Sequence, residues 1–175
     1  PAKLVGVQPG DEYQIKPNLF ARVFPTKHSK GSVGYTIIEK RKKLKEEFIG
    51  LNGPQIVELK KQGIEIDYTL ELPIVTFIGD TQYVDFSQLD YIAKSKILIT
   101  ECTFYEEEHK ERAEAGKHIH IEEFAKLLEN MQNEHIIIVH TTQRTGMREI
   151  NKILKKSMPK NILDKITLLM NKRIK

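Results

Sequence analysis

The sequence predicts a mixed α/β domain in which a mostly parallel sheet is covered by helices. From residue 74 onward, short β-branched segments alternate with segments of helical spacing, an order typical of parallel β-α-β units. The earlier strands are expected to be antiparallel, which makes the sheet mixed. The 175 residues suffice for one domain with a core of its own.

Six segments are predicted as strands because each is short and rich in β-branched or aromatic residues. They are Leu19–Phe24, Tyr35–Glu39, Ile74–Ile78, Lys96–Thr100, His135–Val139 and, as the weakest pattern, Ile166–Met170. Helical spacing predicts helices over Ser87–Ala93, Ile121–Met131 and Gly146–Lys156. Lys40–Lys61 is charged and broken by glycine and proline, so we expect an insertion at about 40–63 with a short helix, Pro54–Gln62, ended by Gly63.

Composition narrows the function classes. The net charge of +4 is compatible with a nucleic-acid partner, but a mild lysine excess is more often only a solvated surface. The single cysteine, Cys102, excludes an internal disulfide and a cysteine-based zinc cluster, and it suits a reducing, cytoplasmic compartment. No apolar run approaches the roughly 20 residues of a membrane span. The chain opens with Pro1, which leaves open that residues precede it.

Polar side chains follow the predicted strands at the point where each strand ends. The first strand runs toward His28, the third ends at Asp80, the fourth at Glu101 and the fifth at His140. Carboxyl ends of parallel strands meet at one edge of a sheet, where ligands bind. Imidazole and carboxylate are ordinary zinc ligands. Each residue alone is better explained as a turn, cap or rim residue, and their coincidence makes a site an equally good explanation.

Two loops add further candidates. His118 and His120 precede a predicted helix, where such a pair can chelate a metal or supply one catalytic imidazole. Thr141, Thr142 and Arg144 precede the next helix, where hydroxyls, a guanidinium and free amides can cradle a phosphate or simply cap the helix.

Four motifs in order resemble a known family. They are "HSKGSVGYTIIE" (His28–Glu39), "FIGDT" (Phe77–Thr81), "ITECTF" (Ile99–Phe104) and "KHIHIEEFA" followed by "IIIVHTTQR". Together they resemble the C-terminal half of metallo-β-lactamase-fold hydrolases of the ribonuclease Z (tRNA 3′-endonuclease) branch. The resemblance implies that residues 1–175 form half of an αββα sandwich, with a mixed sheet and helices on one face.

The resemblance also implies a chemistry, the hydrolysis of RNA phosphodiester bonds with two zinc ions, or with Mn or Fe in their place. The roles it implies are His28 and His140 as ligands of different metal ions, Asp80 as a bridging ligand, His118 as proton donor to the leaving group, Glu101 as the group orienting His118, and Thr142 and Arg144 as phosphate-binding residues.

Departures from the family pattern affect these expectations. Thr100 stands where the family often has His, and His120 replaces a Ser or Thr and has no assigned role. No histidine precedes His28, so the H-x-H-x-D-H motif that supplies further ligands is absent. We therefore expect the chain to be inactive alone and to need an N-terminal half-domain carrying that motif. The expected substrate is RNA, with a tRNA precursor as one option.

Half of a sandwich should also expose one sheet face. The strands are apolar on both faces, which is typical of strands covered on both sides. We expect an open apolar face built from Ile74, Thr76, Ile97, Ile99, Ile136 and Ile138 or their alternates, which pairs with the missing half or makes the chain a homodimer or larger oligomer.

Two other function classes stay open. The high pI and the run "EKRKKLK" (Glu39–Lys45) fit a non-catalytic nucleic-acid-binding module, although no aromatic residues interleave there to stack bases. A metal-dependent hydrolase of a small ester or thioester fits the same motifs, because a fold does not fix a substrate.

Overall fold

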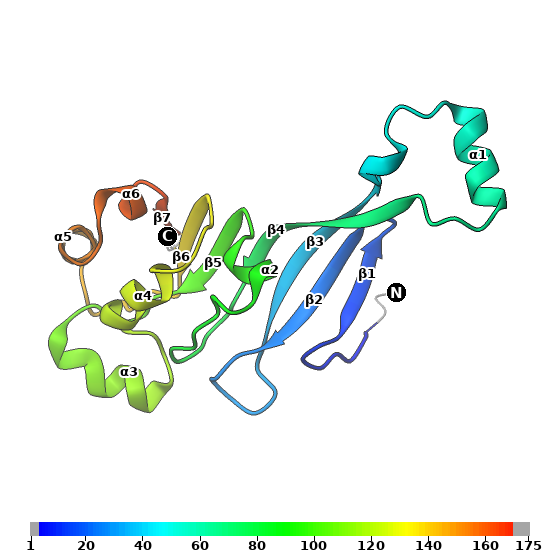
Figure 1. Ribbon diagram of the computed structural model, residues 1–175. Coiled ribbons are helices and arrows are strands. Elements are labelled where there is room, and N and C mark those ends of the chain that lie inside the picture. The colour runs from blue at the N-terminus through cyan, green and yellow to red at the C-terminus, as the bar shows by residue number, and fades with distance from the viewer. Residues whose placement is uncertain (1–3, 170–175) are drawn as a thin grey trace, which may run out of the picture.

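The computed structural model describes residues 4–169. Its strands form one seven-stranded mixed sheet. The strands lie side by side in sequence order, with β1 to β4 antiparallel and β4 to β7 parallel (Figure 1). This is the predicted mixed α/β arrangement. The strands are β1 (Glu12–Lys16), β2 (Leu19–Pro25), β3 (Val33–Leu44), β4 (Asp67–Phe77), β5 (Ile97–Glu101), β6 (His135–Val139) and β7 (Ile166–Leu168).

Helices fill the connections between the parallel strands. They are α2 (Asp90–Ala93), α3 (Lys110–Gly116), α4 (Ile121–Leu128), α5 (Met147–Ser157) and α6 (Lys160–Leu163), with a 3-10 turn η2 (Glu107–His109) before α3. α4 falls inside the predicted helix Ile121–Met131, α5 is shifted by one residue from the predicted Gly146–Lys156, and α2 forms only the last part of Ser87–Ala93. None of the described helices combines the length and the apolar character that crossing a membrane requires.

The core lies between the helices and one face of the parallel strands. Leu98, Ile136 and Ile138 on that face are no more than 2% exposed, and they pack in one cluster with Phe124 of α4 and Ile150 of α5. Side chains of a strand alternate between faces, so their neighbours in sequence point to the other side of the sheet.

The opposite face of the sheet is only partly buried. Tyr35 and Phe77, paired across β3 and β4, are 36% and 45% exposed. Val75, Ile97, Ile99, Ile137 and Val139 continue this surface, and none of them is fully buried. We call these seven residues the open face. The sequence-based set for this face mixed the two sides of the sheet, because Thr76, Ile136 and Ile138 lie on the buried side.

The segment predicted as a charged insertion forms an arm that projects from the sheet (Figure 1). It contains a 3-10 turn η1 (Glu46–Phe48) and helix α1 (Gly53–Lys61), which has no buried residue. α1 lies within one residue of the predicted helix. Asn52 caps it through a capping box with Gln55, and Gly63 follows its end with a positive φ of 75°.

The strands extend further than predicted, because β3 continues to Leu44 and β4 begins at Asp67, so the part of the insertion outside the sheet is residues 45–66. Charged strand residues are neutralised by neighbours on adjacent strands. Arg22 lies 2.7 Å from Glu12 and 2.8 Å from Glu71, and Lys40 also contacts both carboxylates. The hydrogen bond from Arg22 holds the pKa of Glu71 below its usual range. Such cross-strand partners are far apart in sequence, so the local charge pattern hides them.

Three shorter elements were missed. β1 is an edge strand of five exposed residues, and its alternation is carried by only two apolar residues, Tyr13 and Ile15, which is too short a pattern to indicate a strand. α3 buries only Ala113, and α6 has only four residues. The predicted strand at Ile166–Met170 exists as β7, although Met170 lies outside the described residues.

Gly34 offers a test of how closely β2, β3 and β4 pack. A Cβ at this position would lie 2.9 Å from the Phe77 carbonyl oxygen and would overlap the Phe24 ring. We expect Gly34→Ala to reduce the free energy of unfolding by about 1–3 kcal/mol, the usual cost of overpacking, measured by urea denaturation. Gly53→Ala is the control, since a Cβ there meets nothing within 4 Å. Equal stability of the two variants would contradict the close approach.

Candidate metal and phosphodiester site

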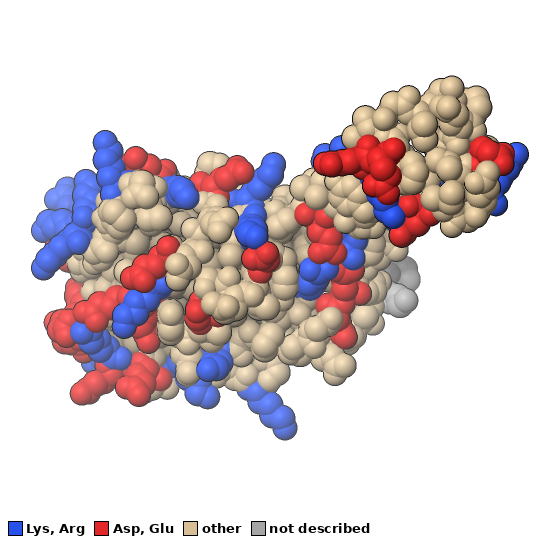
Figure 2. All heavy atoms as spheres, in the orientation of Figure 1, with Lys and Arg blue, Asp and Glu red and all other residues tan. Residues whose placement is uncertain are grey.

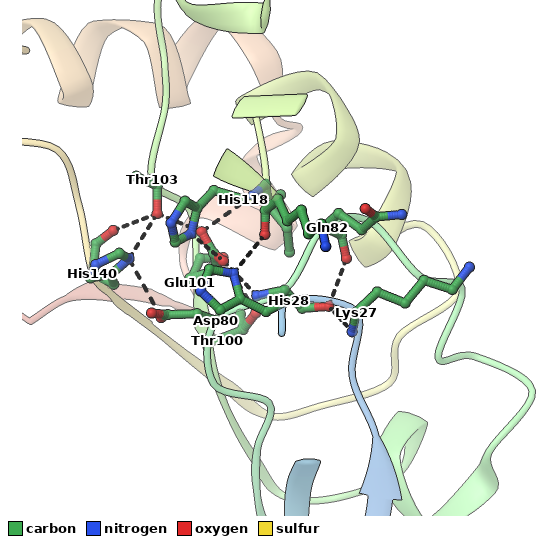
Figure 3. A network of polar contacts seen from close by, with 12 residues as sticks. Lys27, His28, Asp80, Gln82, Thr100, Glu101, Thr103, His118 and His140 are labelled. Atoms are coloured by element: carbon green, nitrogen blue, oxygen red, sulfur yellow. Dashed lines mark hydrogen bonds and ion pairs between the residues drawn. The ribbon is translucent and has the colours of Figure 1, made fainter. Parts of the chain in front are cut away.

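Polar residues converge at the carboxyl edge of the parallel strands (Figure 3). β4, β5 and β6 run parallel, so Asp80, Glu101 and His140 arrive at the same edge. β2 points the same way as β4, because both are antiparallel to β3, and this brings His28 to that edge as well. His118 comes from the loop between α3 and α4.

Asp80, His118 and His140 form the tightest group. One donor atom of each lies within 4.8 Å of the others, and His140 Nδ1 is 3.4 Å from Asp80 Oδ1. The His118 and His140 rings are 4.9 Å apart between centroids. His140 has a positive φ of 53°, a conformation that a non-glycine residue seldom adopts and that occurs often at functional sites. Two imidazoles and a carboxylate are a donor set that fits zinc, manganese or iron.

His28 lies beside this group rather than in it. Its ring centroid is 4.8 Å from that of His118, and its Nδ1 is 3.2 Å from the Lys117 carbonyl oxygen. The three-residue donor group therefore includes His118, which was predicted as the proton donor, and leaves out His28, which was predicted as a ligand. Both roles stay predictions.

Glu101 is completely buried at the end of β5, and its carboxylate oxygens contact four hydrogen-bond donors. Its Oε1 accepts from the Thr81 N–H at 2.7 Å and lies 2.9 Å from His118 Nδ1. Its Oε2 accepts from the Thr103 hydroxyl and from the Ile119 N–H, the latter at 3.2 Å. The expected Glu101–His118 contact is present. It places the proton of the neutral imidazole on Nδ1, and it leaves Nε2 free for other chemistry.

Thr103 and Thr81 are site residues to which the sequence analysis gave no role. The Thr103 hydroxyl lies 3.0 Å from His140 Nδ1 and 2.8 Å from the His140 carbonyl oxygen, so it links Glu101 to His140. The Thr81 hydroxyl accepts from the Lys27 N–H at 2.9 Å and joins the His28 loop to the Asp80 turn. Both threonines stand in the quoted motifs, "FIGDT" and "ITECTF", but their partners are distant in sequence.

His120, which had no assigned role, caps α4. Its Nδ1 accepts from the Glu122 N–H, so its Nε2 carries the proton and donates to the Glu106 carbonyl at 3.2 Å. Its own N–H donates to the Glu123 carboxylate, which completes a capping box. Both ring nitrogens are occupied in this way, so His120 is a structural residue and the H-x-H pair is not a chelate.

The loop after His140 carries the two predicted phosphate-binding residues. The Thr142 N–H donates to the Thr103 carbonyl at 3.0 Å, and the Thr142 hydroxyl accepts from the Arg144 N–H at 3.2 Å. The Arg144 side chain is exposed. Helix α5 has Gly146 as N-cap and no side-chain cap, so the alternative that these residues cap the helix does not hold.

Solved structures share this fold over much of the chain. The metallo-β-lactamase fold protein YhfI from Bacillus subtilis matches with a TM-score of 0.59 at 13% identity, over 94% of this chain and 52% of that one. A long form RNase Z from yeast matches with a TM-score of 0.52 at 19% identity, over 88% of this chain and 17% of that one. The chain therefore has part of a metallo-β-lactamase fold, as predicted.

Sequence relatives narrow the class. tRNase Z TRZ1 of Arabidopsis thaliana is 37% identical over 151 residues, which are 84% of this chain and 54% of that protein. The chloroplastic tRNase Z TRZ2 of the same plant is 32% identical over 161 residues, or 90% of this chain and 46% of that protein. No protein-family model matches. The resemblance to the ribonuclease Z branch is thereby confirmed, and the chain spans about half the length of the curated relatives it matches.

The four donors around Glu101 predict a large effect of Glu101→Gln. Whichever way it is oriented, an amide places its NH2 group against a backbone N–H, that of Thr81 or that of Ile119, and an unsatisfied buried polar group costs about 1–3 kcal/mol. We expect the free energy of unfolding to fall by about that amount in urea denaturation. Glu108→Gln, on an exposed residue, should change it by less than about 0.5 kcal/mol. A Glu101 variant as stable as this control would contradict the network.

Proposed function

We propose that this chain is part of a metal-dependent phosphodiesterase that cleaves RNA, in the manner of ribonuclease Z. The observation that carries the proposal is the group of Asp80, His118 and His140 at the sheet edge, held by the buried Glu101. The similarity to tRNase Z proteins supports RNA as the substrate class. A tRNA precursor is the specific substrate we propose.

We propose a two-metal site in the complete domain, with zinc as the first choice and manganese or iron as alternatives. Asp80 and His140 would hold cations, with His28 after a ring rotation away from the Lys117 carbonyl. A bound divalent cation supplies positive charge that stabilises a phosphate oxygen during attack. Further ligands would come from an N-terminal half with the H-x-H-x-D-H motif, so this chain alone is expected to be inactive.

His118 would act as proton donor. The Glu101 carboxylate accepts from Nδ1 and stabilises the imidazolium, and Nε2 then carries the proton that passes to the leaving oxygen. Arg144 is exposed on the loop after His140 and would contact a phosphate, together with the Thr142 hydroxyl. We expect a cytoplasmic location, in keeping with the free and buried Cys102, whose thiol pKa burial raises.

The roles of His118 and Asp80 separate in a full-length protein. We expect His118→Ala to reduce the rate of cleavage of an RNA phosphodiester about 10²–10⁴-fold, the usual contribution of a general acid. The metal content of this variant, measured by atomic emission, should equal that of the wild-type protein. Asp80→Asn should lower both.

Two results would count against these roles. Metal loss in His118→Ala would make His118 a ligand, as its place in the donor group allows. Turnover of a thioester but not of a phosphodiester by the wild-type protein would favour the small-ester hydrolase, and metal-free RNA binding without turnover would favour the binding module.

The open face would be the contact surface for the missing half. Its apolar side chains are incompletely buried in this chain, and such a surface tends to associate. We propose that residues 1–175 form one half of the sandwich and that the chain alone dimerises or forms larger oligomers through this face.

Sedimentation velocity tests this association. We expect the 175-residue chain to sediment as a dimer or larger species, and Phe77→Asp to shift it toward monomer, because a charge cannot be desolvated cheaply at an apolar interface. Ile49→Asp in the arm is the control, since Ile49 is 70% exposed and lies off the sheet. A monodisperse wild-type monomer that unfolds cooperatively without metal would refute the half-domain proposal.

A further inference from the structure

Helix α5 and its flanks concentrate positive charge. Residues 144–165 contain seven Lys and Arg against two Asp and Glu, a net charge of +5, whereas the whole chain carries +4. Figure 2 shows these blue side chains gathered at the end of the molecule where Figure 1 places α5. Positive charge is therefore concentrated in α5 and its flanks, as it is in the strand segment Lys40–Lys45, and it is not spread evenly along the chain.

The cations lie on the solvent side of the helix. Ile150 and Leu154 are buried against the core, so the opposite side faces out. Arg148, Lys152 and Lys155 are exposed and follow one another at i, i+4 and i+7, which puts them on one stripe. At about 1.5 Å rise per residue, this stripe is roughly 10 Å long, enough to face two or three successive phosphates.

Intramolecular pairing accounts for little of this charge. Lys152 contacts Glu149 at 2.9 Å, an exposed pair worth little. Among residues 4–169, no carboxylate pairs with Arg148, Lys155 or Lys156. The helix dipole favours the two lysines of the last turn, but it disfavours Arg148 in the first. The dipole therefore does not explain the stripe.

The chain runs directly from the candidate site into α5. Arg144 belongs to the loop after His140, and α5 starts at Met147. The segment that carries α3 and α4, residues 102–129, has the opposite balance, with four Lys and Arg against eight Asp and Glu, a net charge of −4. A polyanion entering the site is repelled on the α3–α4 side and attracted on the α5 side.

We propose that α5 is a binding track for the phosphate backbone of RNA, with Arg148, Lys152, Lys155 and Lys156 contacting phosphates beyond the one at the candidate site. This proposal rests on the proposed function, which supplies RNA as the substrate class. It adds the direction in which the RNA strand leaves the site, along α5. Contacts of this kind carry no base specificity, and they make affinity depend on salt.

Binding of a labelled single-stranded RNA oligonucleotide in EDTA tests the track without any cleavage. We expect Lys155→Gln/Lys156→Gln to weaken binding at least several-fold. The plot of log association constant against log salt concentration should become less steep by about 1.4, because each of the two lost phosphate contacts contributes about 0.7 to its slope. The matched control is Lys60→Gln/Lys61→Gln in the last turn of α1, which removes the same charge from another helix. It should leave affinity and slope near the wild-type values.

The outcomes separate the track from the proposed function. Equal weakening by both double variants would overturn the track in favour of general charge attraction. A second adverse result would be displacement of the labelled RNA by polyglutamate as effective as that by an unlabelled RNA competitor of the same total charge. This result would assign the surface to an acidic protein instead. If the full-length protein cleaves RNA but Lys155→Gln/Lys156→Gln leaves binding normal, the track is wrong and the nuclease proposal stands. If the metal-loaded full-length protein binds RNA through α5 but does not cleave it, the track stands and the nuclease proposal is wrong.

Discussion

The site depends on one buried carboxylate. Glu101 is fully enclosed, and a charge in that position is tolerable only because its oxygens are surrounded by donors. Those donors come from the Asp80 turn, the His118 loop and the segment after β5. Each loop that carries a candidate functional side chain is thereby fixed to the end of one strand, and the requirement to satisfy Glu101 determines where these loops lie.

The parallel half of the fold could be predicted because its signals are local. β6 matches its predicted range residue for residue, and the strand ends correctly indicated where Asp80, Glu101 and His140 would meet. Placement of His118 beside Glu101 followed from a family resemblance rather than from spacing. The chemical roles of these residues stay predictions, since geometry alone does not assign them.

What the sequence hid was contact between distant residues. Lys40 to Lys43 lie in a strand because carboxylates on neighbouring strands face some of their charges, and no local pattern reveals those partners. Thr103 contacts His140, which is 37 positions away in sequence, and the second ring nitrogen of the capping residue His120 meets the Glu106 carbonyl, 14 positions away. The mixed set of open-face residues has a similar cause, because register decides which neighbours share a side.

The arm, residues 45–66, carries helix α1 outside the core, so changes within this helix do not affect the packing of the sheet. The chain leaves the sheet at Leu44 and returns at Asp67, which are paired with each other, so the ends of the arm are fixed whatever lies between them. Nothing in α1 is buried in the core. Doubling the length of such a closed segment costs only about 0.6 kcal/mol in chain entropy. The tip can therefore be shortened, extended or exchanged during evolution with little consequence for the strand ends where Glu101 and His140 lie.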